Sequence, residues 1–394
     1  MFVYKPKTGN IPIKIWMSED DYYSDKGMVE QCENLAALPF VYHHIALLPD
    51  GHVGYGMPIG GVMATQGVIV PNAVGVDIGC GVQALKTNLQ DIDTATLKSI
   101  MGNIRKLVPV GFNHRKEAQE WEGFDRPPDV TIIFKELQRA KYQLGTLGGG
   151  NHFIEIQKGS DGYIWIMIHS GSRNFGYKIA NEYHKRAVEL CEKWYSNIPD
   201  NELAFLLNES GALINTPGSD YLNAMNYALS FARENRNRIM MAVEDSFALY
   251  IHNIAFGKPI DVHHNYAVME HHFGKNVMVH RKGAIRARDG DIGIIPGSQG
   301  TASYIVKGKG NPGSFCSCSH GAGRRMGRKQ ARRELDFDTE VRKLDEQGIV
   351  HAIRHVDDLD EASGAYKDID EVMEAQSDLV EIVVKLTPLG VIKG

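Results

Sequence analysis

The sequence has few cysteines and no long apolar run. Five cysteines occur among 394 residues, at positions 32, 80, 191, 316 and 318. This low and odd number argues against a disulfide scaffold and indicates a reducing compartment. No stretch approaches the roughly 20 apolar residues of a membrane-spanning helix, and residues 1–20 contain no apolar signal-peptide core. We therefore expect a soluble, cytoplasmic protein with no membrane partner.

The chain also lacks a strong charge of either sign. Its formal net charge is −5, which argues against a protein that coats nucleic acid indiscriminately but leaves room for a local basic cleft. With 43% hydrophobic and 23% charged residues, the composition is that of an ordinary globular protein. We expect residues 1–394 to form a single compact domain of mixed α/β type. In this fold β-sheets are flanked by helices, and the functional site lies at strand ends.

Apolar, β-branched runs that end in polar, glycine-rich turns predict the strands. The clearest run is 163–168, which is followed directly by His169, and similar runs occupy 67–70, 277–279 and 292–295. Reactive groups presented from the ends of rigid strands are typical of an active site.

Apolar residues that recur on one face predict helices over 179–194 and 222–247. A last helix is predicted to begin after Asp368 as N-cap and to end before Pro388. It would bury Val372, Leu379, Val383 and Leu386. Loops are expected at 118–130, 196–220 and 356–365, and none is long or biased enough to mark a domain boundary.

The segment 316–325, Cys-Ser-Cys-Ser-His-Gly-Ala-Gly-Arg-Arg, is the most informative part of the chain. Its histidine, His320, is followed by small residues, which let backbone N–H groups approach a phosphate, and then by two guanidinium groups. His320 could be a metal ligand, a phosphate contact or a nucleophile that takes a phosphoryl-type group covalently. A loop histidine beside a solvated basic run is the alternative without function.

Five residues spread along the chain have the chemistry of metal ligands. They are Asp77, Cys80, His152, His169 and His264. A thiolate with neutral imidazoles can bind a metal ion, and five ligands are enough for two metals if one ligand bridges. The donor types leave Zn²⁺, Mn²⁺ and Mg²⁺ open. With these ligands assigned, His320 is not needed for the metal, which favours its covalent role.

Two further segments indicate phosphate or ligand binding. Residues 148–155 combine three glycines with Asn151, His152 and Glu155, and residues 296–301 resemble a phosphate-binding loop that lacks the Walker A lysine. Ser298 and Ser303 add hydroxyl donors to the second segment. The basic run 324–333 could hold a nucleic-acid backbone or form a solvated helix face.

Together these segments resemble the RtcB family of RNA-splicing ligases. The matching motifs run nearly end to end, at 49–54, 74–81, 144–155, 169–173, 263–266, 296–298, 316–324, 365–370 and 391–394. The sequence differs from the common family pattern at Gly51, Gln299 and Gly327, none of which is a metal ligand or the nucleophile. The difference at Gln299 bears on ligand binding beside that residue.

The resemblance implies a GTP- and Mn²⁺-dependent ligase that joins RNA ending in a 3′-phosphate or 2′,3′-cyclic phosphate to RNA with a 5′-hydroxyl. By this similarity His320 attacks the α-phosphate of GTP and forms a histidine–GMP adduct. GMP then passes to the RNA 3′-phosphate, and the 5′-hydroxyl displaces it. The five ligands hold two manganese ions, with Cys80 as the bridge. The resemblance specifies no activating protein partner.

The resemblance also implies a guanine-nucleotide site. Its residues would be Asn151, His152, Phe153, Ile154, Glu155, His264, Asn265, Pro296, Gly297, Ser298, Gln299, Ser303, His320, Gly321, Ala322, Gly323 and Lys393. Two other functions remain open. A binuclear metallo-phosphoesterase would use the same ligands with His320 as a general acid, and a non-enzymatic protein would only bind guanine nucleotide or RNA.

Overall fold

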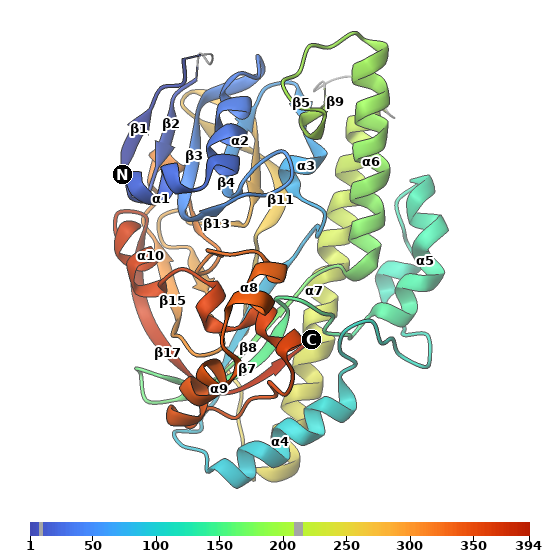
Figure 1. Ribbon diagram of the computed structural model, residues 1–394. Helices are drawn as coiled ribbons and strands as arrows, with labels where there is room; N and C mark the ends of the chain where they lie inside the picture. Colours follow the sequence, from blue (N-terminus) through green and yellow to red (C-terminus); the bar gives the residue numbers. More distant parts are fainter. Residues whose placement is uncertain (8–10, 209–215) are drawn as a thin grey trace.

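Two large β-sheets form the frame of the molecule, and helices cover them (Figure 1). The computed structural model describes residues 1–7, 11–208 and 216–394. The predicted mixed α/β class is confirmed. In the described part of the chain, no helix is both long and apolar enough to cross a lipid bilayer.

The first sheet has six strands, and all of its pairs are antiparallel except β2–β3. In spatial order the strands are β1 (Phe2–Tyr4), β2 (Ile13–Ile15), β3 (Val41–His52), β4 (Ile59–Thr65), β12 (Lys275–Lys282) and β11 (Asn265–His272). Helices α1 (Glu19–Ser24) and α2 (Lys26–Ala36) lie beside its first strands.

The second sheet has seven strands, all paired antiparallel, and is a nearly closed barrel because its two end strands lie against each other. In spatial order the strands are β10 (Ile260–His263), β6 (Gly81–Lys86), β8 (Ile164–Ser170), β7 (Phe153–Gly159), β17 (Val380–Lys393), β15 (Ser303–Gly308) and β14 (Ile292–Ile295). Two short ribbons join β13 (Ala284–Arg286) to β16 (Ser317–Ser319) and β5 (Val68–Ile69) to β9 (Leu206–Leu207).

The remaining helices surround this frame. They are α3 (Pro71–Val74), α4 (Thr94–Leu107), α5 (Thr131–Gln143), α6 (Arg173–Lys193), α7 (Pro217–Tyr250), α8 (Arg328–Glu334), α9 (Phe337–Glu346) and α10 (Ile369–Ala375). The predicted helices over 179–194 and 222–247 are confirmed as parts of α6 and α7, which run side by side (Figure 1). Their apolar stripes meet in one core cluster.

Period-2 alternation along the barrel strands separates core side chains from site side chains. On β7 and β8, Ile154, Ile156, Ile166 and Ile168 pack against α4 and α7 in one apolar cluster. The intervening residues point to the other face of the sheet, as strand geometry requires. Glu155 and His169 lie on that face, so the register of these strands decides which groups reach the site.

Three predicted segments differ from the structure. The acidic loop 356–365 contains two 3₁₀ helices, η4 (Val356–Glu361) and η5 (Ser363–Ala365), and loop 118–130 contains η1 (Glu122–Phe124). Within the predicted loop 196–220, η2 (Asn201–Leu203) and β9 form, α7 begins at Pro217, and residues 209–215 lie outside the described residues.

The predicted last helix is wrong beyond Ala375. Asp368 caps α10 as expected, but the chain then forms β17, which pairs with both β7 and β15. The run 380–384 is mostly β-branched, and two neighbouring strands satisfy its backbone hydrogen bonds. A register shift between Ile305 and Val306 of β15 lies opposite Val383, which is exposed, whereas Val384 is buried.

Val383 and Val384 therefore provide a direct test of the strand. We expect Val384→Ala to lower the free energy of unfolding by about 1–3 kcal/mol, because buried methyl groups are lost from the core. Val383→Ala should change it by less than about 0.5 kcal/mol, since that side chain is 52% exposed. Urea unfolding of the two variants measures both values. A larger loss for Val383→Ala would support the helix instead.

Candidate active site

The functional residues converge because the ends of β6, β7, β8 and β10 meet at one edge of the barrel. Cys80 comes directly before β6, and His152 comes directly before β7. The antiparallel partner β8 brings His169 to the same edge, opposite Phe153 and Val82. His264 follows the last residue of β10, which pairs with Gly81. The prediction that the site lies at strand ends is confirmed.

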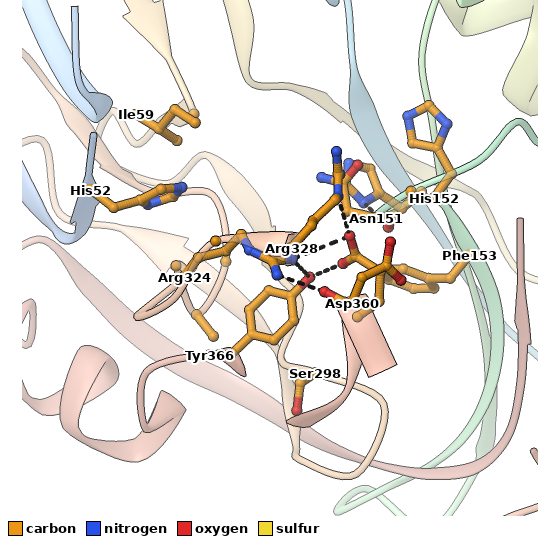
Figure 2. Close-up of a pocket in the computed structure, with 18 of the residues that line it drawn as sticks. His52, Ile59, Asn151, His152, Phe153, Ser298, Arg324, Arg328, Asp360 and Tyr366 are labelled. Carbon is orange, nitrogen blue, oxygen red and sulfur yellow. Dashed lines mark hydrogen bonds and ion pairs between the residues drawn. The ribbon is translucent and has the colours of Figure 1, made fainter. Parts of the chain in front are cut away.

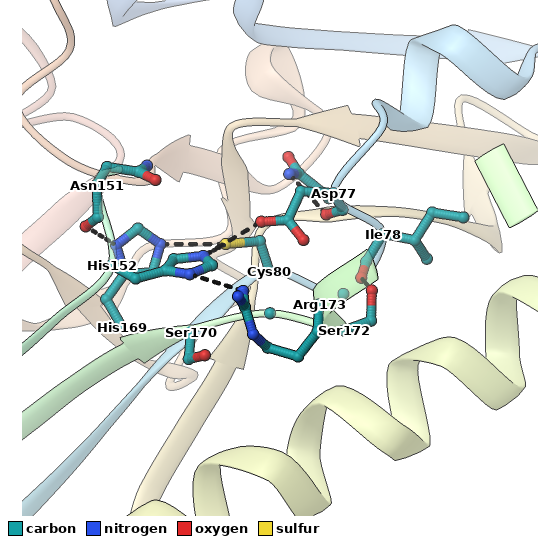
Figure 3. Close-up of polar contacts among 12 residues, drawn as sticks. Asp77, Ile78, Cys80, Asn151, His152, His169, Ser170, Ser172 and Arg173 are labelled. Atoms are coloured by element: carbon teal, nitrogen blue, oxygen red, sulfur yellow. Dashed lines mark hydrogen bonds and ion pairs between the residues drawn. The ribbon is translucent and has the colours of Figure 1, made fainter. Parts of the chain in front are cut away.

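Cys80, His152 and His169 form a buried group that could hold a metal ion. One ligand atom from each lies within 4.8 Å of the others. The Cys80 Sγ atom is 3.2 Å from Nε2 of His169 and 3.4 Å from Nε2 of His152 (Figure 3). A thiol with two imidazoles is a ligand set that suits divalent transition metals.

Asp77 and His264 flank this group. The Asp77 carboxylate lies 3.3 Å from Nε2 of His152. The His264 ring packs edge-on against His169, with 5.1 Å between ring centroids. Nδ1 of His264 is buried and has no hydrogen-bond partner among the described residues. A buried imidazole nitrogen without a partner is expensive, which fits a ligand whose metal ion would satisfy it.

Burial holds the imidazoles of the site in the neutral form. It lowers the pKa of His152, and it lowers the pKa values of His169 and His264 still further. Burial and the Asp77 charge raise the pKa of the Cys80 thiol well above its ordinary value. Burial would also raise the pKa of Asp77, but the hydrogen bond from His152 and the charge of Arg173 hold it at about 2. Neutral imidazoles are ready to coordinate, whereas the thiol must first lose its proton.

Arg173 orients His152 from the other side. Its guanidinium donates to Nδ1 of His152 at 3.2 Å (Figure 3). This contact leaves Nε2 with the ring proton, which points to Asp77 and Cys80. A metal ion bound at Nε2 would require the ring proton to move to Nδ1, so the Arg173 contact belongs to the metal-free site. Gly148 makes the contact possible, since a Cβ there would lie 2.1 Å from the guanidinium.

His320 lies next to this group but is held by a different residue. Its Nδ1 is 2.6 Å from a carboxylate oxygen of Asp50, which also accepts the His320 backbone N–H at 3.1 Å. Asp50 is fully buried and lies where the β3–β4 register is interrupted, between Leu47 and His52. A β-bulge of this kind re-aims side chains. The His320 ring also packs against His264, with 4.8 Å between centroids.

The fixed Nδ1 leaves Nε2 of His320 as the reactive position. Nε2 makes no hydrogen bond to the residues that the structure describes, and the side chain is 15% exposed. The following turn is close to Asp50 because Gly323 has no side chain, and a Cβ there would lie 2.2 Å from the Asp50 carbonyl oxygen. A histidine with one nitrogen bound to a buried carboxylate and the other free has the geometry of a nucleophile or general base.

A cavity of about 1670 Å³ surrounds these residues. All five predicted metal ligands and the predicted nucleotide residues line it, except Ile154 and Ser303. Ile154 packs in the apolar cluster behind the sheet. Ser303 lies behind the loop 296–299, where its hydroxyl accepts the backbone N–H of Gly297 at 3.1 Å. These two residues could therefore act only through backbone atoms or through the residues that they position.

Glu155 and Lys393 lie on the floor of the cavity, on neighbouring strands. Burial raises the pKa of Glu155 to about 8, although Lys393 and a hydrogen bond from Gln157 oppose this effect. Burial likewise lowers the pKa of Lys393, against the attraction of Glu361 and Glu155. Both groups are thus held where their charges are poorly solvated, and a polar ligand could satisfy them.

The basic run 324–333 is largely neutralised within the protein. Glu361 lies 3.2 Å from Arg324 and 2.8 Å from Arg328 and accepts a hydrogen bond from Tyr366. Arg332 pairs with Asp360 at 2.7 Å. Figure 2 shows Arg324, Arg328 and Tyr366 together in the wall of the cavity. Arg328 and Arg332 therefore hold α8 against η4, and Arg324 pairs with the same segment, which leaves fewer guanidinium groups for a nucleic-acid backbone.

The residues that differ from the common family pattern have distinct environments. Gly51 is tightly packed, since a Cβ there would lie 2.7 Å from Met17. The Gln299 amide donates to the Glu361 carbonyl oxygen at 2.9 Å and so ties the loop 296–299 to η4. Gly327 faces open space. Gln299 and Gly327 both line the cavity, and of the two only Gln299 has a side chain that bonds to its wall.

Sequence reasoning did not assign Asp50 or Arg173 to the site. Both lie in segments that matched the family pattern, and each contacts a predicted residue only after distant strands pair. An acidic residue that does not vary among related sequences, two positions before His52, would have indicated a role for Asp50. Such invariance can be recognised only when several sequences are compared.

Comparison with known proteins gives a consistent result. The family model described as tRNA-splicing ligase RtcB matches residues 31–394. The RNA-splicing ligase RtcB of Escherichia coli K12 is 38% identical over 413 residues, covering 98% of each chain. The tRNA-splicing ligase RtcB of Pyrobaculum aerophilum is 34% identical, covering 98% of this chain and 95% of its own.

Metal binding should depend on pH through Cys80. Because the metal-free thiol is protonated, metal binding at Cys80 displaces its proton, and the affinity for a divalent metal ion should rise with pH. Cys80→Ser should weaken divalent-metal binding by roughly tenfold or more and flatten this pH dependence. Titration calorimetry in buffers of different ionisation enthalpy measures both effects. Cys316→Ser, outside the cavity, is the matched control, and equal behaviour of the two variants would exclude Cys80 as a ligand.

Proposed function

The chain belongs to the RtcB family of RNA-splicing ligases and is an RNA ligase, and we propose that it works through a guanylylated His320. The reaction joins RNA with a 3′-phosphate or 2′,3′-cyclic phosphate to RNA with a 5′-hydroxyl, in tRNA splicing and RNA repair. The observation that carries this proposal is the contact between His320 and the buried Asp50, which leaves Nε2 free beside the predicted metal ligands.

In the first step Nε2 of His320 attacks the α-phosphorus of GTP. The new P–N bond forms as the bond to the β-phosphate oxygen breaks, and pyrophosphate leaves. Asp50 accepts the Nδ1–H hydrogen bond and stabilises the positive ring that develops, as the carboxylate does in a Ser-His-Asp triad. Asp50 does not touch the substrate, so it is a positioning residue.

Two Mn²⁺ ions fit the donor set of the site. Asp77, Cys80, His152, His169 and His264 would hold them, with Cys80 as the bridging ligand. The orphaned Nδ1 of His264 and the close Cys80 contacts support this assignment. Bound metal would neutralise charge on the phosphates during displacement at phosphorus.

The guanine base would be recognised at Glu155. Guanine presents two adjacent N–H donors, at N1 and N2, and a carboxylate can accept both. Adenine presents an acceptor at N1 and would repel the same group. In the neighbouring loop 296–299 the Gly297 and Ser298 N–H groups donate to Ser303 and Thr301, so the Gln299 N–H and the Ser298 hydroxyl are the groups offered to sugar or phosphate oxygens. Lys393 adds a positive charge beside Glu155.

In the later steps GMP passes from His320 to the RNA 3′-phosphate, and the 5′-hydroxyl displaces GMP to form the phosphodiester. A cyclic end is first opened to a 3′-phosphate by water. We also propose that residues 1–394 form one catalytic domain, because the site needs Asp50 from the six-stranded sheet and ligands from the barrel. The free Cys80 thiol requires a reducing compartment, which favours the cytoplasm.

Incubation with α-labelled GTP and Mn²⁺ tests the first step. We expect label to become attached to the protein and to be absent in His320→Ala. Asp50→Asn should slow adduct formation by roughly 10²- to 10⁴-fold, because the ring loses its orienting carboxylate. Hydrolysis of phosphate esters without an adduct would support a metallo-phosphoesterase. Nucleotide or RNA binding without either reaction would support a binding protein.

Glu155→Gln tests the choice of base. We expect GTP affinity to fall by roughly 10- to 100-fold, with little change for ATP, because a charged hydrogen-bond acceptor is lost. The pKa of free Glu155 is about 8, so in the wild type GTP affinity should rise as pH approaches 8 and level off above it. Glu155→Gln should abolish this rise. Equilibrium binding from pH 6.5 to 9 measures it, and Glu371→Gln, exposed and outside the cavity, is the control.

A further inference from the structure

Arg236, on helix α7, is a fully buried arginine that none of the proposed steps uses. α7 packs against β6 and β8, whose ends carry predicted metal ligands. The Arg236 side chain does not line the cavity that contains these ligands. It therefore touches neither substrate nor metal ion, and a role in the reaction would have to act through its neighbours.

Each of the five N–H donors of the Arg236 guanidinium has an acceptor. Nε and Nη2 donate to the two carboxylate oxygens of Asp261 at 2.9 and 2.7 Å. Nη1 donates to the carbonyl oxygens of Gly79 at 3.1 Å and Ser170 at 2.9 Å. Nη2 also donates to Nδ1 of His263 at 3.2 Å. The guanidinium is thus held in one orientation by β8, β10 and the turn before β6.

Three of these acceptor residues are adjacent in sequence to predicted metal ligands. The pairs of neighbours are Gly79 and Cys80, His169 and Ser170, and His263 and His264. The three ligands come from different strands or strand ends, so no local contact along the chain sets their spacing. A rigid, planar guanidinium that binds beside all three can set it.

Asp261 neutralises the charge of Arg236 and holds the guanidinium in place. Burial would raise the pKa of Asp261, but the charge and hydrogen bonds of Arg236 hold it below its ordinary value. The carboxylate also accepts a hydrogen bond at 3.3 Å from Gln83, its partner across β6 and β10. Because the ion pair is neutral overall, it adds little repulsion toward a cation bound at Cys80.

The residue before Arg236 supports the remaining imidazole. Asn235 is fully buried, and its side-chain oxygen accepts the backbone N–H groups of residues 145 and 146 at 2.7 and 3.1 Å. Its amide nitrogen donates to the Ser170 hydroxyl at 3.0 Å. Residues 145 and 146 lead into the glycine-rich loop that presents His152. Two adjacent positions of α7 thus reach the segments that carry four of the five predicted ligands.

Stability alone does not account for an arginine at this place. A buried ion pair loses much of its attraction to the cost of removing both charges from water, and apolar side chains of similar volume often stabilise a core as well. An apolar side chain could not satisfy the carbonyl groups of Gly79 and Ser170, however, and unpaired buried carbonyl groups are costly. A lysine has its donors on one atom and could not reach all four acceptor residues.

We propose that Arg236 is a positioning residue of the predicted metal site. It fixes the spacing of Cys80, His169 and His264 before a metal ion binds, so that the ion meets ligands already in place. Asp261 is its partner, because it orients the guanidinium. This inference rests on the metal assignment of the proposed function and adds the residue that holds the ligands in position.

Metal binding by the metal-free protein, without GTP or RNA, tests the proposal. Arg236→Lys keeps the positive charge but cannot make the same set of hydrogen bonds. We expect its affinity for Mn²⁺, measured by titration calorimetry, to fall by roughly 10- to 100-fold, the range typical of residues that orient metal ligands. With Co²⁺ as a second probe, the thiolate charge-transfer absorption should weaken and the visible bands should change, because both depend on the arrangement of the ligands.

Arg281 provides a matched control, since it is also a fully buried arginine paired with a carboxylate. Its guanidinium donates to Glu270 at 2.9 and 3.0 Å and bonds to no residue adjacent to a predicted metal ligand. Arg281→Lys should lower the urea midpoint of unfolding, as Arg236→Lys should. It should leave the Mn²⁺ affinity and the Co²⁺ spectrum unchanged, whereas a purely structural role of Arg236 would give both variants the same result.

Asp261→Asn decides the question if Arg236→Lys does not fold. The amide keeps the shape of the carboxylate but not its charge, so the guanidinium is less firmly oriented. We expect Mn²⁺ affinity to fall by roughly three- to tenfold, the loss that follows when a charged hydrogen bond becomes a neutral one. A change of charge alone would lower the affinity without altering the Co²⁺ spectrum, so the spectrum must change as well. Arg233→Ala, which removes an exposed arginine 3.9 Å from the same carboxylate, should change neither.

The outcomes separate this inference from the proposed function. If the wild type binds neither Mn²⁺ nor Co²⁺, the metal assignment is wrong, and the inference falls with it. If the wild type binds both and Arg236→Lys shows equal affinity and an unchanged spectrum, only the assignment of Arg236 is wrong. An equal loss of affinity in Arg281→Lys also overturns it, because the effect would then be one of general stability. Where Arg236→Lys does not fold, an unchanged spectrum in Asp261→Asn has the same consequence.

Discussion

The antiparallel register of β6, β7, β8 and β10 is the constraint on which the site depends. Pairing of Gly81 with Ser170 and of Phe153 with His169 brings the thiol and two imidazoles to one edge of the barrel. A slip of one residue in β8 would turn His169 toward the helices and expose Ile168 on the site face. The isoleucines that pack on α4 and α7 prevent this slip, because it would remove them from the core. Packing on the apolar face of the sheet thus determines which side chains reach the site on the other face.

His264 connects the barrel to the six-stranded sheet. It stands between β10, which belongs to the barrel, and β11, which belongs to the other sheet. Its N–H donates to the Cys80 carbonyl oxygen at 2.9 Å, and its carbonyl oxygen accepts the Ala284 N–H at 3.1 Å. Ala284 pairs with Ser319, directly before His320. Backbone hydrogen bonds therefore set the spacing between the thiol and His320, and two independent sheets become one site.

Sequence patterns predicted the elements whose apolar period is unambiguous. The strand at 163–168 and helices α6 and α7 follow from one-face or buried runs, and the five predicted ligands do gather. The last predicted helix failed beyond Ala375 because Val372 lies on α10, whereas Val383 and Leu386 lie on a strand that pairs with β7 and β15 far away in the sequence. Asp50 and Arg173 were missed for another reason. Each acts through a contact across more than 20 positions of sequence, which no local pattern encodes.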